Sequence, residues 1–380
     1  MEVILEKVKV DVITLHAVQN YGSALQTFAT QELFKEHGCE VTIIDYIRED
    51  IKPKNTIKER SGGNPIKEII LLPTVYHWKK VFTKFIHQYL NLSDKSYTAD
   101  EDFELYPLTA DAYCTGSDQV WNSKWNKGIL PCLYLSFVPE KCYKFSFAAS
   151  FGQSRLSEEE VLTTKAYLKQ YNRLSVRESS AKKIFDEQYG IPGAVHILDP
   201  TACVSGDFWR KYVSPRKIRE DYILIYNLNR SKEFDNYAVE LSRRTGLMLV
   251  RFCNRYDQFY RPGKSMLIPE VFDFISLIDN ARYVLTDSFH ATVFSINMNT
   301  EPICVYPQEF GGRLESFLTL VDSLHRHIED YNDFDVVNRP VDFGKVNNIL
   351  ADERRKASDF IDEVVADIRK VKNERKKNSL

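Results

Sequence analysis

The stretch VKVDVITLHAVQNYGSALQTFATQELFKEHGCEVTIIDY, residues 8–46, decides the expected fold. Residues 8–15 and 39–46 are rich in β-branched and apolar side chains, as is typical of buried strands. Between them, apolar side chains recur on one helical face, at Leu25, Phe28, Ala29, Leu33 and Phe34. A strand, a polar loop, a helix and a second strand in this order predict the opening of a doubly wound α/β sheet.

A second series of the same kind follows a charged segment, residues 209–221, which has the composition of a linker. Strands are expected at residues 221–229, 247–254, 281–287 and 301–307, with amphipathic helices between them. The sequence therefore predicts an α/β protein of two doubly wound, Rossmann-like lobes, residues 1–213 and 214–345. Residues 346–380 predict a long amphipathic helix that crosses back to the first lobe and ends in a basic tail.

Residues 48–108 interrupt the alternation and are interpreted as a helical insertion in the first lobe. Lys79, Lys80 and Lys84 lie on faces other than the apolar one, which carries Val75, Trp78, Val81, Phe82, Phe85, Ile86 and Tyr89. Two interpretations remain open. The helix covers the first lobe, or it is a basic amphipathic element near an acceptor or a membrane surface.

Composition excludes several classes of protein. A net charge of −2 over 380 residues gives no general attraction to nucleic acid. The seven cysteines have no metal-binding spacing, so we expect reduced, buried thiols and no metal site. The first residues lack the continuous apolar region of a signal peptide, and no apolar run approaches ~18 residues. We therefore expect a cytoplasmic protein, with the inner face of the cell membrane as a further expected location.

Five polar loops each follow an expected strand: residues 16–23, 115–119, 177–180, 199–201 and 287–290. Open α/β sheets bind ligands at the carboxyl ends of their strands, so we expect the site among these loops.

His290 is the first candidate. If Asp287 or Ser288 caps the following helix, His290 lies in its first turn, where backbone N–H groups and the helix dipole favour an anion. There a histidine can act as a general acid or bind phosphate. The alternative is a histidine that only makes local hydrogen bonds at a helix start.

The other loops offer further candidates, each with a plain alternative. Arg177 suits bidentate binding of a carboxylate or phosphate, or is a surface arginine paired with Glu178 or Asp186. Asp118 suits a base or a sugar-hydroxyl acceptor, or only shapes a turn. Arg313 follows two glycines and suits a mobile cation, or is a solvent-exposed arginine at a helix start.

Six motifs in the order HAVQNYGSALQ, TGSDQVWN, SVRESSAKKI, LDPT, TDSFHATVFSI and GGRLESFL resemble the polysaccharide pyruvyl transferase family. They run from residue 16 to about residue 320, each at a predicted strand end. The resemblance implies a two-lobed GT-B-like fold, with the acceptor on the N-terminal lobe and the donor on the C-terminal lobe. It also implies transfer of a pyruvyl group from phosphoenolpyruvate to two sugar hydroxyls as a cyclic ketal, with release of phosphate.

The resemblance carries roles to individual residues. Arg177 matches the family arginine that is thought to hold the donor, and His290 matches the family histidine that is implicated in donor binding or acid catalysis. Many members have an arginine two residues before that histidine, where this chain has Ser288. We therefore name Arg313 and Arg251 as replacement cations, and count Ser288 among the donor residues. Asp118 is the candidate base, and the expected acceptor-side residues are Asn20, Tyr21, Ser117 and Gln119.

Phosphoenolpyruvate enters as a co-substrate, and no cofactor is expected. The expected acceptor is a sugar of a cell-surface polysaccharide or capsule precursor, carried on a lipid-linked oligosaccharide, with peripheral membrane contact. Two other classes compete. One is a GT-B glycosyltransferase that uses a nucleotide sugar, and the other is a non-catalytic sugar-binding protein of the same fold.

Overall fold

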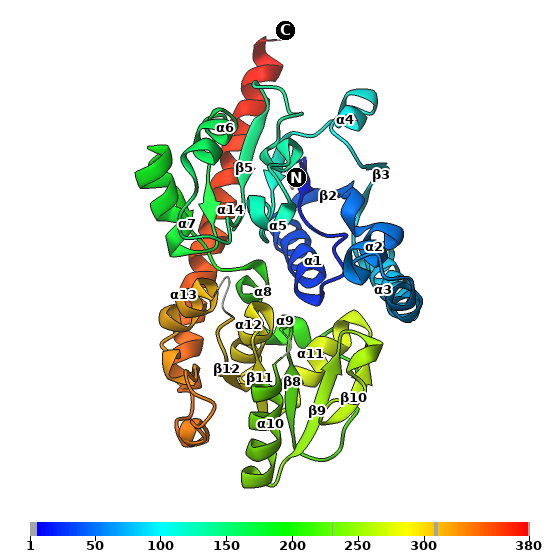
Figure 1. Ribbon diagram of the computed structural model, residues 1–380. Helices are drawn as coiled ribbons and strands as arrows, with labels where there is room; N and C mark the ends of the chain where they lie inside the picture. Colours follow the sequence, from blue (N-terminus) through cyan, green and yellow to red (C-terminus); the bar gives the residue numbers. More distant parts are fainter. Residues whose placement is uncertain (1–5, 230, 308–310, 379–380) are drawn as a thin grey trace. The chain divides into compact units, whose positions relative to one another are not determined.

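A computed structural model describes residues 6–229, 231–307 and 311–378 (Figure 1). The chain divides into two compact units. Unit 1 comprises Met1–Ile51, Ile86–Cys203 and Glu353–Leu380, and unit 2 comprises Lys52–Phe85 and Val204–Asp352.

Unit 1 is built on a parallel sheet with the strand order β3-β2-β1-β4-β5. Its strands are β1 (Val8–Ile13), β2 (Cys39–Tyr46), β3 (Leu92–Tyr97), β4 (Ala112–Thr115) and β5 (Tyr143–Ser146). The short strands β6 (Ser175–Val176) and β7 (Val195–His196) pair with each other, and isolated bridges join β6 to the β5 side. The helices are α1 (Tyr21–Glu36), α4 (Glu101–Leu105), α5 (Ser123–Asn126), α6 (Glu158–Leu168), α7 (Ser179–Lys183) and α8 (Pro200–Cys203).

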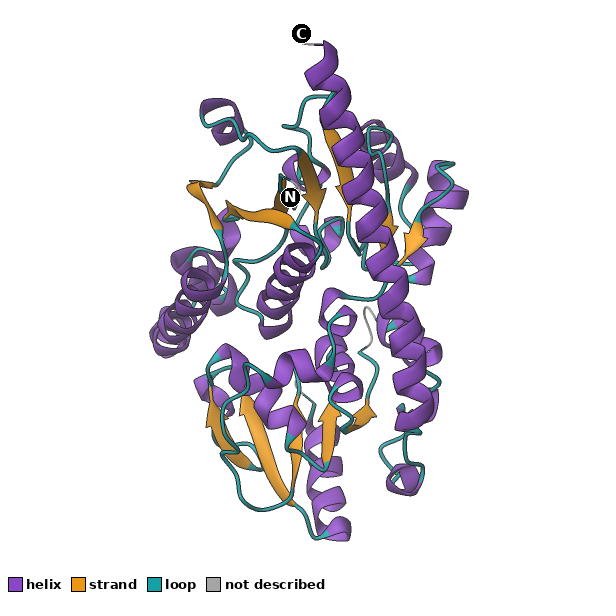
Figure 2. Ribbon diagram, turned by 180° about the vertical axis from the view of Figure 1, so that it is seen from behind, coloured by secondary structure: helices purple, strands orange, loops and turns teal. Residues whose placement is uncertain are grey.

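Unit 2 repeats this plan with the parallel strand order β10-β9-β8-β11-β12. Its strands are β8 (Tyr222–Tyr226), β9 (Met248–Cys253), β10 (Lys264–Leu267), β11 (Tyr283–Thr286) and β12 (Glu301–Cys304). The helices are α2 (Pro53–Ser61), α9 (Gly206–Arg210), α10 (Lys232–Thr245), α11 (Val271–Asp279), α12 (Phe289–Asn297) and α13 (Gly312–Leu320). Figure 2 shows helices on both faces of each sheet, as parallel sheets require.

The strand order reverses once in each sheet, between β1 and β4 in unit 1 and between β8 and β11 in unit 2. Connections on the two sides of such a point run to opposite faces, which leaves a crevice at the carboxyl ends of the two strands. Each sheet is buried among apolar side chains, so the polar groups of the unit are pushed to these edges. The topology therefore marks one candidate ligand edge in each unit.

Two helices contribute to both units. α14 (Phe343–Asn378) begins in unit 2 and continues in unit 1 from Glu353, so the predicted return of the C-terminal helix is confirmed. Figure 2 shows it as one continuous helix. α3 (Pro65–Tyr89) lies in unit 2 up to Phe85 and ends in unit 1.

The structure differs from the predicted organisation of the lobes in three respects. Residues 52–85, which the sequence analysis placed in the first lobe, pack in unit 2, because Trp78 Nε1 donates to the carbonyl of Asn254 (2.5 Å) and Phe85 contacts Phe272. Unit 2 also begins at Val204 and not near residue 214, since Trp209 of α9 packs on Phe294 of α12. Residues 92–97, expected within the insertion, form the edge strand β3 of unit 1.

All seven cysteines lie in the described residues and are free thiols, and six of them are buried, as expected. Burial raises the pKa of the Cys39 thiol to about 11, which suits a packing role. Within the described ranges no group of histidine, cysteine and carboxylate side chains has the arrangement of a metal site. No described helix is long and apolar enough to cross a membrane.

Candidate functional site

The crevice edge of unit 2 is organised around Asp287, directly after β11. Its carboxylate accepts hydrogen bonds from the backbone N–H groups of Leu228 (2.7 Å) and Asn229 (2.8 Å), in the loop after β8. The side-chain amides of Asn227 and Asn229 add two more, at 3.0 and 2.9 Å. Burial raises the pKa of Asp287, although these hydrogen bonds oppose the change. Asp287 thus joins the two loops that form the edge.

Helix α12 begins at this edge. Ser288 is its N-cap residue, and its hydroxyl oxygen accepts from the N–H of Ala291 (3.4 Å). His290 lies in the first turn and is 8% exposed, and its ring contacts the ring of Phe289. The predicted position of His290 is confirmed, and the dipole of a nine-residue helix favours an anion there.

Of the two replacement cations named from the sequence, only Arg313 lies beside α12. Its guanidinium is 5.6 Å from the centre of the Phe289 ring. Arg251 lies in β9, is 1% exposed, and is held by Asp235 (2.7 Å) and by the carbonyl of Pro262 (2.9 Å). Arg251 therefore has an internal structural role, and Arg313 is the better candidate.

The crevice edge of unit 1 is organised around Asp118, after β4. The hydroxyl of Ser23, in the first turn of α1, donates to Asp118 Oδ2 at 2.5 Å, and Gln119 N donates to Oδ1. Asp118 itself adopts a left-handed backbone conformation, φ 77°, which aspartate tolerates better than most residues. The hydroxyl of Thr14 donates to the carbonyl of Ser117 across the same edge (2.7 Å).

Arg177, after β6, belongs to this edge of unit 1 and is fully buried among carboxylates. Its guanidinium lies 2.7 Å from Asp199 and 3.1 Å from Glu178, with Asp118 farther away at 3.9 Å. Burial alone lowers the pKa of Arg177, but Glu178, Asp199 and Asp118 outweigh it and raise that pKa. The predicted surface pair is wrong, because the pair with Glu178 is internal. These carboxylates surround the guanidinium, which favours a role for Arg177 in positioning Asp118 and Asp199. The predicted contact of Arg177 with a donor remains a prediction.

The remaining acceptor-side candidates make local contacts. Asn20 caps α1 by accepting from the N–H groups of Gly22 and Ser23. Tyr21 is buried in the same turn. Gln119 accepts from the side-chain amide of Asn122, and Ser117 donates to Asp199 at 3.3 Å. Their predicted contact with an acceptor remains a prediction.

The sequence analysis did not name His16 as a site residue, although it named its loop. His16 follows β1, and its Nε2 lies 3.0 Å from Asp45 at the end of β2. Burial alone raises the pKa of Asp45, but hydrogen bonds from His16 and from Ser96 of β3 hold that pKa below its ordinary value. His16 Nδ1 is buried and has no hydrogen-bond partner among the described residues. The sequence feature that could have identified His16 is its position in the polar loop directly after the first predicted strand.

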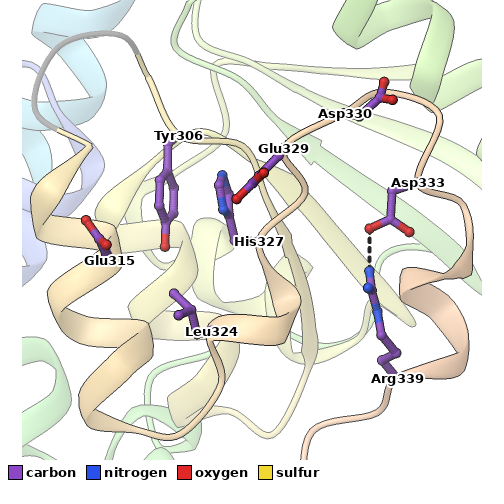
Figure 3. A pocket seen from close by; sticks show the side chains of 8 residues that line it. All are labelled: Tyr306, Glu315, Leu324, His327, Glu329, Asp330, Asp333 and Arg339. Atoms are coloured by element: carbon purple, nitrogen blue, oxygen red, sulfur yellow. Dashed lines mark hydrogen bonds and ion pairs between the residues drawn. The ribbon is translucent and has the colours of Figure 1, made fainter.

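Unit 2 also has a pocket of about 570 Å³ beyond β12 (Figure 3). Tyr306 and His327 stack face to face there, with ring centres 3.4 Å apart. Arg339 pairs with Asp333, and the other acidic side chains that line the pocket are Glu315, Glu329 and Asp330. Burial lowers the pKa of His327, against the influence of Glu329 and Glu315. An excess of carboxylates opposes an anionic ligand, so this pocket does not suit phosphoenolpyruvate.

Residues 20–309, more than half of the chain, match the family described as polysaccharide pyruvyl transferase. The chain belongs to the polysaccharide pyruvyl transferase family. Asp118, Arg177 and His290 lie inside the matched range. Arg313 lies just beyond the matched range. The resemblance inferred from the six motifs is therefore confirmed.

Solved structures show how this pyruvyl transferase family member folds. A putative UDP-N-acetylglucosamine 2-epimerase from Listeria monocytogenes is 12% identical, with a TM-score of 0.50 over 91% of this chain and 96% of that one. A UDP-glucosyltransferase from Polygonum tinctorium is 9% identical, with a TM-score of 0.50 over 96% and 98% of the two chains. Such neighbours support the expected GT-B-like architecture of two Rossmann-like sheets, and at these identities they show the fold alone. No curated protein matches the chain.

Proposed function

We propose that this pyruvyl transferase family member moves a pyruvyl group from phosphoenolpyruvate to a sugar of a cell-surface polysaccharide precursor, as a cyclic ketal. The observation that carries the proposal is the position of His290. The histidine that matches the family histidine lies in the first turn of α12, at the crevice edge of a doubly wound sheet.

The donor side of the proposal rests on unit 2. Phosphoenolpyruvate carries a phosphate and a carboxylate, so its site needs cations and N–H donors. The start of α12 offers the positive end of a helix dipole, Ser288 offers a hydroxyl, and Arg313 offers a guanidinium beside Phe289. His290 completes this set as an acid or as a phosphate ligand.

The acceptor side rests on unit 1. Asp118 is a buried carboxylate that accepts hydrogen bonds from the Ser23 hydroxyl and from Gln119 N. The guanidinium of Arg177 lies near Asp118 and pairs with Asp199. A carboxylate that is oriented in this way suits the task of accepting a proton from a sugar hydroxyl. The expected acceptor is a lipid-linked oligosaccharide.

The proposed chemistry balances without a redox step. Protonation of the methylene carbon of phosphoenolpyruvate, with His290 as the acid, makes C2 electrophilic. One sugar hydroxyl adds to C2 and gives its proton to Asp118. The bond between C2 and the phosphate oxygen then breaks, and a neighbouring hydroxyl closes the ketal at C2. Of the two hydroxyl protons, one restores the proton that His290 gave to the methyl group, and the other leaves with the phosphate.

A glycosyltransferase that uses a nucleotide sugar is the second candidate, because the GT-B-like fold is shared with a UDP-glucosyltransferase. Thermal shift separates the two. A ligand that binds only the folded state raises the melting temperature, so phosphoenolpyruvate should stabilise the full chain and UDP-glucose should not. Stabilisation by UDP-glucose alone would favour the glycosyltransferase.

A further inference from the structure

The first half of α3 presents an apolar face to solvent in unit 2. Ile66, Ile69, Ile70 and Tyr76 are 69, 68, 59 and 58% exposed, and Leu72 is 38% exposed. The spacing of Ile66, Ile69 and Ile70 places them on one side of the helix. Scattered exposed apolar residues are ordinary, but a contiguous set on one helix marks an interaction surface. We call these five residues the α3 stripe.

The α3 stripe belongs to a helix that is held firmly at both ends of the exposed segment. The side chain of Asn64 accepts from the N–H groups of Ile66 (3.0 Å) and Lys67 (3.1 Å), which caps the helix start. Beyond the stripe, His77 Nδ1 is 2.7 Å from the hydroxyl of Tyr256, and the indole of Trp78 donates to Asn254. The apolar face is therefore a fixed feature of unit 2.

The segment around the stripe is strongly basic. Residues 52–84 contain eight lysines and arginines against two glutamates, while the whole chain has a net charge of −2. Six lysines of α2 and α3 are exposed: Lys54, Lys58, Lys67, Lys79, Lys80 and Lys84. α2 and α3 lie side by side, with Arg60 of α2 4.9 Å from the centre of the Trp78 ring (Figure 1).

An apolar face within a basic segment is complementary to one kind of surface. Amphipathic helices with this composition lie in the interface of anionic membranes, with the apolar face among the acyl chains and the lysines near the headgroups. A second copy of this chain is disfavoured as the occupant, because it would bring one basic segment against another. We propose that the α3 stripe, together with the exposed lysines of α2 and α3, binds an anionic lipid bilayer.

Co-sedimentation of the full chain with vesicles tests this proposal. The vesicles are phosphatidylcholine alone, and phosphatidylcholine with about 30% phosphatidylglycerol. The wild-type chain should pellet with the anionic vesicles at low salt, and less at high salt. The double variant Ile69→Ser/Ile70→Ser should bind at least about tenfold more weakly. Lys79→Gln/Lys80→Gln should lose most of the preference for anionic lipid.

Leu162→Ser is the matched control, because Leu162 of α6 is 76% exposed and lies outside the α3 stripe. It should bind vesicles as the wild type does, and all variants should keep their melting temperatures. Absence of binding at low salt, or equal binding by the stripe variant, would overturn the proposal. So would a dimer in solution that the stripe variant dissociates. The readout does not use catalysis, so its failure leaves the proposed pyruvyl transfer intact.

Discussion

Arg313 is the cation that we assign to the donor, in place of the arginine that many family members carry at the position of Ser288. Replacing it by glutamine should weaken phosphoenolpyruvate binding by about 10- to 100-fold, the scale of a lost charge-assisted hydrogen bond. Isothermal titration calorimetry measures this affinity. Arg219→Gln, at an exposed site of unit 2, is the control and should bind normally. Equal donor affinity in the two variants would remove Arg313 from the site.

Unlike Arg313, Arg177 has a structural role, because carboxylates inside unit 1 balance its charge. Arg177→Met would leave Asp118, Glu178 and Asp199 buried together without their cation. We expect the free energy of unfolding to fall by about 3–5 kcal/mol in urea titrations at pH 8.

The control for this prediction is Arg243→Met, at an exposed ion pair with Glu240 on α10, which should leave the free energy of unfolding near the wild-type value. An Arg177→Met protein as stable as the wild type would contradict the view that Arg177 stabilises the three buried carboxylates.

Among the elements, β1 contains an unusual aspartate. Asp11 is 6% exposed in the centre of the unit 1 sheet, and burial raises its pKa from 3.8 to about 6, against the influence of Lys9. The folded state thus binds this proton more tightly than the unfolded state. The stability contributed by the protonated carboxyl is complete below pH 3.8 and is lost as the pH rises through about 6.

Asp11→Asn should therefore raise the free energy of unfolding at pH 8 by up to about 3 kcal/mol, the scale of two pKa units. The difference from the wild type should shrink as the pH is lowered towards 4. Asp94→Asn, at an exposed site on β3 of the same sheet, is the control and should leave the free energy of unfolding near the wild-type value. A pH-independent difference at Asp11 would contradict the raised pKa.

Elements with a local signal were predictable from the sequence. The residues Thr-Asp-Ser before an apolar helical run placed His290 at a helix start, and the structure has it there. The environment of Arg177 was not predictable, because Asp118 and Asp199 are distant in sequence and only the parallel sheet brings them together. The apolar face of α3 that carries Val75, Trp78 and Phe85 was predictable as a buried face, but an amphipathic pattern does not say which unit covers it.

At the scale of the whole molecule, the two units share one plan, and the proposed function gives them different tasks. Each sheet has the same strand order, and each places an aspartate after the strand beside its reversal point, Asp118 in unit 1 and Asp287 in unit 2. The Asp287 carboxylate accepts hydrogen bonds from the backbone N–H groups of the neighbouring loop. Ser288, His290 and the start of α12 are the other groups at this edge. Asp118 accepts from the hydroxyl of Ser23 and the N–H of Gln119 and lies near Arg177, and we propose that it exchanges a proton with the acceptor.

The measurement that tests this account most directly is acceptor-dependent phosphate release from phosphoenolpyruvate, over a panel of lipid-linked and nucleotide-linked sugars. The wild-type chain should release phosphate with at least one acceptor, and His290→Asn should fold normally but turn over about 10²-fold more slowly. His325→Asn, at an exposed histidine of unit 2, should behave as the wild type. A fully active but less stable His290→Asn protein would contradict the assignment of His290 to the donor.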